Sequence, residues 1–139
     1  MNVSAELAQQ LRSAGLKWKP SLHDFFMVPD TAVSDRHFVL TDMMANISVL
    51  QGHHAITFNG AVEWALDFVY LLDALWVPTE AQVRTQLMNR LPNKSLALRL
   101  TDDEFECEVR PAEEPLVFSA PTAADAYGRA LLFLLQQDG

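Results

Sequence analysis

Apolar side chains near the N-terminus recur about one helical turn apart. Leu7 and Leu11 follow Ser4, which suits a helix N-cap, and Gly15 comes where a helix of this length would end. The pattern predicts a helix over residues 4–14. After it, apolar residues form short extended runs separated by proline, glycine and aspartate. These runs predict an antiparallel meander of three or four strands, at residues 24–28, 37–43, 46–50 and 55–58.

The middle of the chain predicts two helices. Apolar side chains cover almost every side of residues 61–75, so this helix is expected to be buried, either at the centre of the fold or in a dimer interface. Residues 80–91 show an ordinary amphipathic pattern. Thr79 precedes them as a cap, and Gln82 stands at the capping-box position three residues later.

Strict alternation of apolar and polar residues indicates two strands, at 96–100 and 104–109. Their apolar residues lie on one side of a hairpin only if the loop between them holds an even number of residues. The predicted register then pairs Leu96 with Val109, Leu98 with Cys107, Leu100 with Phe105 and Arg99 with Glu106, with the turn centred on Asp102-Asp103.

The C-terminal part predicts a third strand at 116–118 and a helix from the cap Thr122 to about residue 136. Gly128 lies inside this helix, where glycine costs about 1 kcal/mol relative to alanine, so we expect another backbone to approach closely there. The order α-β(3-4)-α-α-β(3)-α predicts an α+β fold. About four helices would pack against antiparallel sheets in a single domain over residues 1–139.

Acidic residues outnumber basic ones by eighteen to ten, which gives a formal net charge of −8. Because nucleic-acid binding depends on clustered lysine and arginine, we do not expect direct contact with nucleic acid. The acids concentrate between residues 102 and 114, and the alternate glutamates Glu104, Glu106 and Glu108 would share one strand face. This face is a candidate surface for a basic protein partner, although a solvated face is the commoner meaning of such a run.

Two carboxylates and a phenol are the candidate catalytic groups. Glu63, Asp67 and Tyr70 would line one narrow stripe of the apolar helix at 61–75. The stripe is either the solvated side of a buried helix or a small polar groove for ligand binding or acid–base chemistry, with a neighbouring histidine. Acids at 63, 67 and 73 argue against a membrane span.

The histidines are weak candidates for a metal site. His53 and His54 are adjacent, so they would point to opposite faces of a strand, and only His37 with Asp42 on a neighbouring strand could complete a ligand set. The chain has no phosphate-binding glycine loop, dinucleotide fingerprint or nucleophile elbow. We therefore expect no metal and no cofactor.

Cys107 is the only cysteine, which excludes an intrachain disulfide. It stands between Phe105 and Val109 on the apolar face of its strand, so we expect a buried structural thiol. The N-terminus lacks the basic start and unbroken apolar core of a secretion signal. These features indicate a cytoplasmic protein.

Four segments of the chain resemble a group of small, largely uncharacterised bacterial proteins. They are Trp18-Lys19-Pro20 with Asp24 and Phe26, the run Phe58 to Asp67, Trp76-Val77-Pro78 with Gln82, and Ala126-Tyr127-Gly128. Some members carry the label "pilus assembly protein", but proteins of that name resemble partitioning-type ATPases, whose phosphate loop this sequence lacks. The resemblance implies a bacterial origin and one compact domain, and it carries over no catalytic or binding residue.

Taken together, these patterns favour a non-enzymatic protein–protein interaction module that also associates with itself, as a homodimer. A specific version is an acidic inhibitor or immunity-type protein for a basic partner. The alternative is a small-molecule-binding protein or hydrolase that uses the groove of Glu63, Asp67 and Tyr70.

Overall fold

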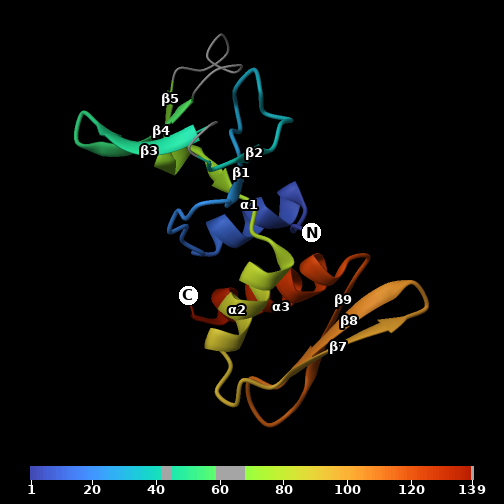
Figure 1. Ribbon diagram of the computed structural model, residues 1–139. Helices are drawn as coiled ribbons and strands as arrows, with labels where there is room; N and C mark the ends of the chain where they lie inside the picture. Colours follow the sequence, from blue (N-terminus) through green and yellow to red (C-terminus); the bar gives the residue numbers. More distant parts are fainter. Residues whose placement is uncertain (42–44, 59–67, 139) are drawn as a thin grey trace. The chain divides into compact units, whose positions relative to one another are not determined.

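Three α-helices and three antiparallel sheets make up the part of the chain that the computed structural model describes, which is residues 1–41, 45–58 and 68–138 (Figure 1). The contacts divide the chain into two compact units. Unit 1 comprises residues 1–17 and 78–139, and unit 2 comprises residues 18–77. The predicted α+β class is confirmed, whereas a single domain over residues 1–139 stays a prediction. None of the described helices is both long and apolar enough to cross a membrane.

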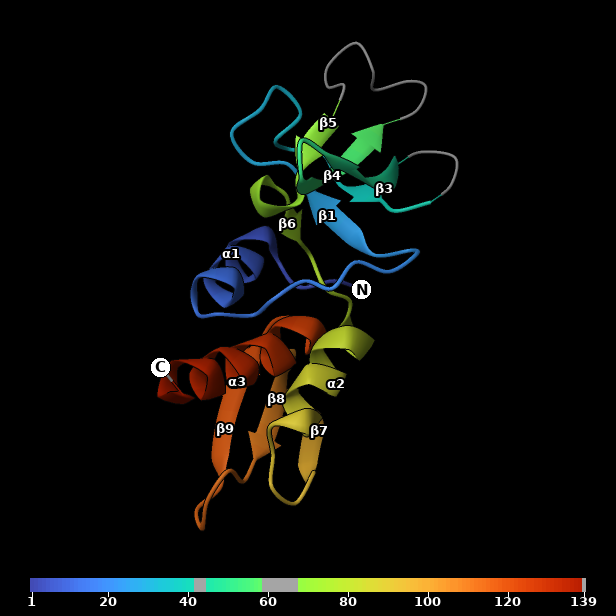
Figure 2. The same ribbon diagram turned by 90° about the vertical axis from the view of Figure 1, so that its left-hand side faces the viewer.

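Unit 1 contains all three α-helices of the described residues and one sheet. Its elements are α1 (Ala5–Ser13), α2 (Glu80–Asn89), β7 (Leu96–Thr101), β8 (Glu104–Val109), β9 (Leu116–Ala120) and α3 (Ala123–Asp138). Helix α3 contacts α1 and α2 as well as strands β8 and β9. Figure 2 shows α2 beside α3. Helix α3 is therefore the element that joins the helices of this unit to its sheet.

The caps of these helices are those that the sequence predicts. The Ser4 hydroxyl accepts a hydrogen bond from the Leu7 N–H at 3.2 Å, and Thr79 and Gln82 form the expected capping box of α2. At the start of α3, the Thr122 hydroxyl accepts a hydrogen bond from the Asp125 N–H at 3.1 Å. The three predicted helices of unit 1 are thus confirmed, with bounds that differ from the predicted ones by one or two residues.

The predicted β7–β8 hairpin is also confirmed in its register. Leu98 pairs with Cys107 and Arg99 pairs with Glu106, and β9 continues the sheet on the other side of β8. Asp102 and Asp103 form the turn with positive φ angles of 49° and 69°. Two consecutive positive φ angles give the turn whose twist matches that of the flanking strands.

Gly128 lies where α3 meets α1. A Cβ atom at this position would stand 2.5 Å from Leu7 Cδ2 and 3.3 Å from Val3 Cγ1. The expected close approach is therefore present, but side chains of the N-terminal segment make it rather than a backbone. A larger residue at this position therefore requires the Leu7 side chain to move.

Unit 2 consists of short strands in two three-stranded antiparallel sheets. One sheet has the order β2-β1-β6 and the other has the order β3-β4-β5. The elements are β1 (Phe25–Met27), β2 (Phe38–Val39), β3 (Ala45–Leu50), β4 (His53–Phe58), β5 (Phe68–Tyr70), the 3₁₀ turn η2 (Leu71–Asp73) and β6 (Leu75–Trp76). Three of the predicted strands, at 24–28, 46–50 and 55–58, thus form with bounds shifted by one or two residues. The strand predicted at 37–43 is only Phe38–Val39 in its described part, since residues 42 and 43 lie outside the described residues. The predicted meander is divided between two sheets.

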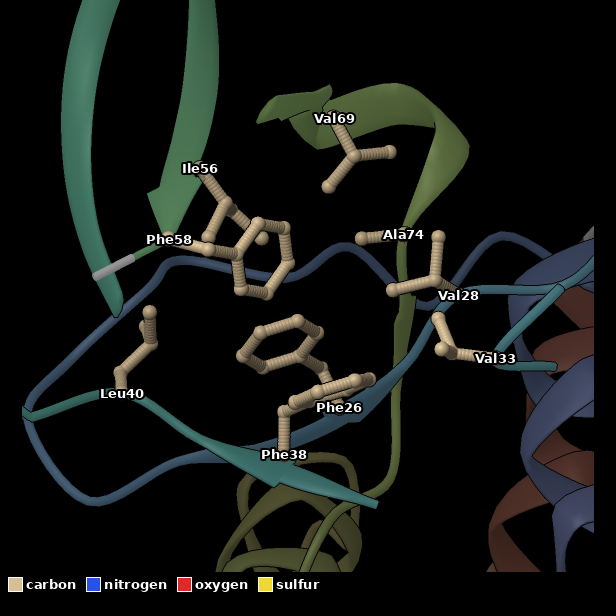
Figure 3. Packing of buried hydrophobic residues seen from close by; sticks show 9 residues of the cluster. All are labelled: Phe26, Val28, Val33, Phe38, Leu40, Ile56, Phe58, Val69 and Ala74. Atoms are coloured by element: carbon tan, nitrogen blue, oxygen red, sulfur yellow. The ribbon is translucent and has the colours of Figure 1, made fainter. Parts of the chain in front are cut away.

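Three phenylalanine rings form the centre of the unit 2 core. Phe26 from β1 lies 5.5 Å from Phe38 and 6.1 Å from Phe58, measured between ring centroids. Figure 3 shows these rings packed together among smaller apolar residues of unit 2. The aromatic cluster therefore connects the two sheets of unit 2.

The predicted helix at 61–75 is wrong in the part that the structure describes. Residues 68–70 form strand β5, which pairs with β4, and residues 71–76 form a 3₁₀ turn and strand β6. Val69 lies on the buried side opposite Ile56, while its two aromatic neighbours lie on the other side. A continuous apolar run fits a buried helix and buried strands equally well by periodicity, and pairing with β4 and β1 decides in favour of strands.

Candidate functional site

The outward side of strand β8 carries a row of acidic side chains. Cys107 and Val109 are buried on the inner side. The alternation of the strand therefore places Glu104, Glu106 and Glu108 together on the outer side. We call these three glutamates the acidic sheet face. The structure thus brings together the three residues that the sequence predicts as a partner-binding surface.

Neighbouring strands supply one base and one apolar residue to this face. Arg99 of β7 lies between two of the glutamates, with its Nε 3.6 Å from Glu106 and its Nη2 3.2 Å from Glu108. Val117 of β9 pairs with Glu108 and is 48% exposed. Within the described residues, Glu104 makes no ion pair. The face is therefore acidic. Arg99 offsets part of the charge of Glu106 and Glu108, and the apolar Val117 lies beside Glu108.

The surrounding segment adds more negative charge. Between residues 97 and 119 the chain has seven acidic residues and two basic ones, Arg99 and Arg110. The Arg110 guanidinium donates a hydrogen bond to the backbone oxygen of Glu113, and it forms no ion pair with a carboxylate among the described residues. Exposed ion pairs contribute about 0–1 kcal/mol to stability, so the pairs of Arg99 are not what holds the hairpin together.

Cys107 is buried on the inner side of the same strand, as the sequence predicts. Burial raises the pKa of its thiol from 9.0 to about 11, because the thiolate would lose its hydration. A nucleophilic thiol needs a lowered pKa and access to solvent. Cys107 has neither property, so it is a structural residue of the sheet.

We expect this buried thiol to make unit 1 sensitive to alkaline pH. Because the folded-state pKa is raised, the contribution of Cys107 to stability is complete below pH 9 and is lost as the pH rises through about 11. The full loss, reached above pH 11, should be at most about 3 kcal/mol. Chemical denaturation at several pH values should show this extra loss in the wild type and not in Cys107→Ala. Equal pH dependence of the two proteins would contradict it.

The predicted groove of Glu63, Asp67 and Tyr70 is only partly within the described residues. Glu63 and Asp67 lie outside them. Tyr70 belongs to β5 rather than to a helix, so the predicted helical stripe does not include it. Its ring packs edge-on against His53, with 5.7 Å between the centroids, and against Phe68 at 5.3 Å. A histidine does neighbour Tyr70, and a catalytic role for the groove stays a prediction.

The candidate metal ligands lie in different surroundings. His53 and His54 are adjacent on β4, opposite Leu50 and Val49, and therefore point to opposite faces of the sheet. His37 precedes β2 in the other sheet of unit 2, and Asp42 lies outside the described residues. Among the residues that the structure describes, no group of three metal-ligating side chains lies together.

Asp24 is a structural polar residue that sequence reasoning did not single out as a site. It is 3% exposed, and it is the only buried charged residue in the described parts of the chain. Its Oδ2 accepts hydrogen bonds from Trp18 Nε1 and from the Ser21 N–H, both at 2.9 Å. The serine–aspartate spacing of three, which is typical of capping boxes, is the signal that could have identified it.

Comparison with known proteins identifies no relative of this chain. No family model, curated protein or solved structure matches the chain. The resemblance to the small bacterial proteins therefore stays a prediction. The structure itself shows an α+β protein with an acidic sheet face.

Proposed function

We propose that the protein acts without chemistry of its own, by binding a protein partner with a basic surface through the acidic sheet face. The observation that carries this proposal is the row of Glu104, Glu106 and Glu108 on the outward side of β8. Alternate residues of a strand stand about 7 Å apart, so the row offers regularly spaced acceptors to lysine or arginine.

The composition of the face suits recognition of a protein. Charges at the rim of an interface raise the association rate and exclude wrong partners, but each contributes little affinity. Affinity comes mainly from apolar contacts, and the exposed Val117 beside Glu108 supplies one. An acidic inhibitor or immunity-type protein for a basic toxin or enzyme, acting in the cytoplasm, fits this combination of charge and apolar surface.

Replacing the three glutamates of the acidic sheet face by glutamine should weaken partner binding about tenfold or more, because the complementary charges are lost. The tagged wild type is first used to isolate and identify the partner from a bacterial lysate. The affinity of the purified pair is then measured at low and at moderate salt. We expect strong salt dependence for the wild type and weak dependence for the variant.

A matched control removes the same charge elsewhere in the same segment. Asp102→Asn, Glu113→Gln and Glu114→Gln change exposed acids outside the row of β8. This control should bind as the wild type does if the row itself forms the contact. If both triple variants bind equally well, or lose equal affinity, the acidic sheet face is not the binding surface.

A further inference from the structure

Strand β3 is an edge strand of its sheet in the part of the chain that the structure describes. It is the end strand of the order β3-β4-β5, and within the described residues it pairs only with β4. Its six residues, Ala45–Leu50, contain no charged residue and no proline. Edge strands of soluble proteins normally carry such residues to prevent pairing with another chain.

The outer part of the β3–β4 hairpin is only two strands wide in the described structure. Strand β5 pairs with Ala55–Thr57 of β4, so His53 and His54 have β3 as their one partner strand there. The hairpin extends beyond β5 in Figure 1. Two-stranded ribbons are marginally stable in water, so a further strand beside β3 would stabilise this segment.

Two apolar side chains of β3 are exposed. Ile47 is 38% exposed and Val49 is 60% exposed. They lie on the same side of the strand, and the register pairs Ile47 with the buried Ile56, which is paired in turn with the buried Val69. The buried apolar side of the sheet therefore continues onto β3, where the described residues leave it partly in solvent.

The distribution of charge favours a second copy of the chain as the occupant. The chain has a net charge of −8, yet residues 45–58 contain no Asp, Glu, Lys or Arg. Two identical acidic molecules repel each other least where both are uncharged. The other long edge strands are poorer candidates, because β7 adjoins the acidic sheet face and Arg129 donates a hydrogen bond to Ser119 O on β9.

Ser48 indicates the register. Its hydroxyl oxygen is buried and has no hydrogen-bond partner among the described residues. An antiparallel pair of β3 strands with its two-fold axis at Ser48 would place the two Ser48 side chains directly opposite each other. Because this oxygen is buried within the single chain, the Ser48 side chain would turn toward the strand edge on dimerisation, where hydroxyl pairs form cross-strand hydrogen bonds. The same axis sets Ile47 opposite Val49 of the second copy, so the exposed apolar residues cover one another.

We propose that two copies of the protein associate through antiparallel pairing of their β3 strands, centred on Ser48, to form one continuous six-stranded sheet. The interface is isologous, as in most two-fold dimers. It lies on a different sheet from the acidic sheet face, so this proposal does not depend on the proposed function.

Light scattering during size-exclusion chromatography tests the association. The wild type should have twice the mass of a 15.6 kDa chain. Val49→Lys should weaken the dimer about 100-fold and give a monomer. The two valines that the dimer would bury are then replaced by two lysines, whose charges repel each other across the interface. The matched control is Val117→Lys, which makes the same change at an exposed strand position in the other unit and should remain a dimer. A monomeric wild type, or equal masses for both variants, would overturn the proposal.

Two further measurements keep the test independent of folding defects. Amide hydrogen exchange of the wild type should slow at residues 47–50 when the protein concentration rises, and unchanged exchange there would refute the interface. Ser48→Cys should form a covalent dimer under mild oxidation, because the proposed axis places the two new cysteines opposite each other. The native Cys107 is buried and does not compete for the cross-link. If this variant stays a dimer in solution but does not cross-link, the register centred on Ser48 is wrong.

Discussion

Replacing Gly128 by leucine should destabilise unit 1 by about 3 kcal/mol, because the new side chain would occupy the space that Leu7 fills. A Cβ alone would lie 2.5 Å from Leu7 Cδ2, and leucine adds three further carbon atoms. Helix α3 would then have to move away from α1, which exposes apolar surface of both helices. The expected result is a lower midpoint for the loss of helical circular dichroism.

A double-mutant cycle separates this overlap from helix propensity. Alanine at an exposed position in a helix interior is more favourable than glycine by about 1 kcal/mol, so Gly128→Ala would stabilise the protein if nothing stood in the way. We expect it to destabilise instead, and to become neutral or favourable when Leu7→Ala is also present. Gln136→Leu, at an exposed position of α3, is the control and should have little effect. Additive effects at the two sites would contradict the close packing.

The location of the tryptophans lets each unit be followed separately. Trp18, Trp64 and Trp76 all belong to unit 2, whereas the three described α-helices belong to unit 1. Tryptophan fluorescence therefore reports on unit 2, and far-ultraviolet circular dichroism reports mainly on unit 1. Coincident transitions by both signals are what the predicted single domain requires.

Local rules were sufficient to predict unit 1. Its helices begin at residues whose side chains bond the first free N–H groups, such as Ser4 and Thr79, and these bonds depend on residues three positions apart. The β7–β8 register follows from side-chain alternation and from an even turn at Asp102-Asp103. The glutamates of the acidic sheet face were therefore predictable as a group.

The sequence was not sufficient for unit 2, because its strands are short and their partners are distant. Phe68–Tyr70 becomes a strand through pairing with β4, and Leu75–Trp76 does so through pairing with β1. No local pattern specifies those partners, so the apolar run predicted a helix. The exposed edge of β3 was unpredictable for the same reason, since an edge is known only when the order of the sheet is known.

Replacing Asp24 by alanine should destabilise unit 2 by about 3 kcal/mol, because two donors lose their acceptor. Trp18 Nε1 and the Ser21 N–H both bond to Oδ2, and the carboxylate side chain is buried. The segment from Trp18 to Asp24 is held to the core through these bonds and through the Trp18 ring, which lies 5.8 Å from Phe26. Thermal unfolding followed by tryptophan fluorescence should therefore shift to lower temperature.

Asp24→Asn is the informative control, because both donors share one oxygen atom. An asparagine carbonyl in the position of Oδ2 can accept both hydrogen bonds, so these two bonds are kept while the charge is lost, and the cost should be about 1 kcal/mol. Trp18→Phe keeps an aromatic ring beside Phe26 but removes one donor, and in the Asp24→Ala background it should cost less than it does alone. If asparagine were as harmful as alanine, the two hydrogen bonds to Oδ2 would not be what stabilises this segment.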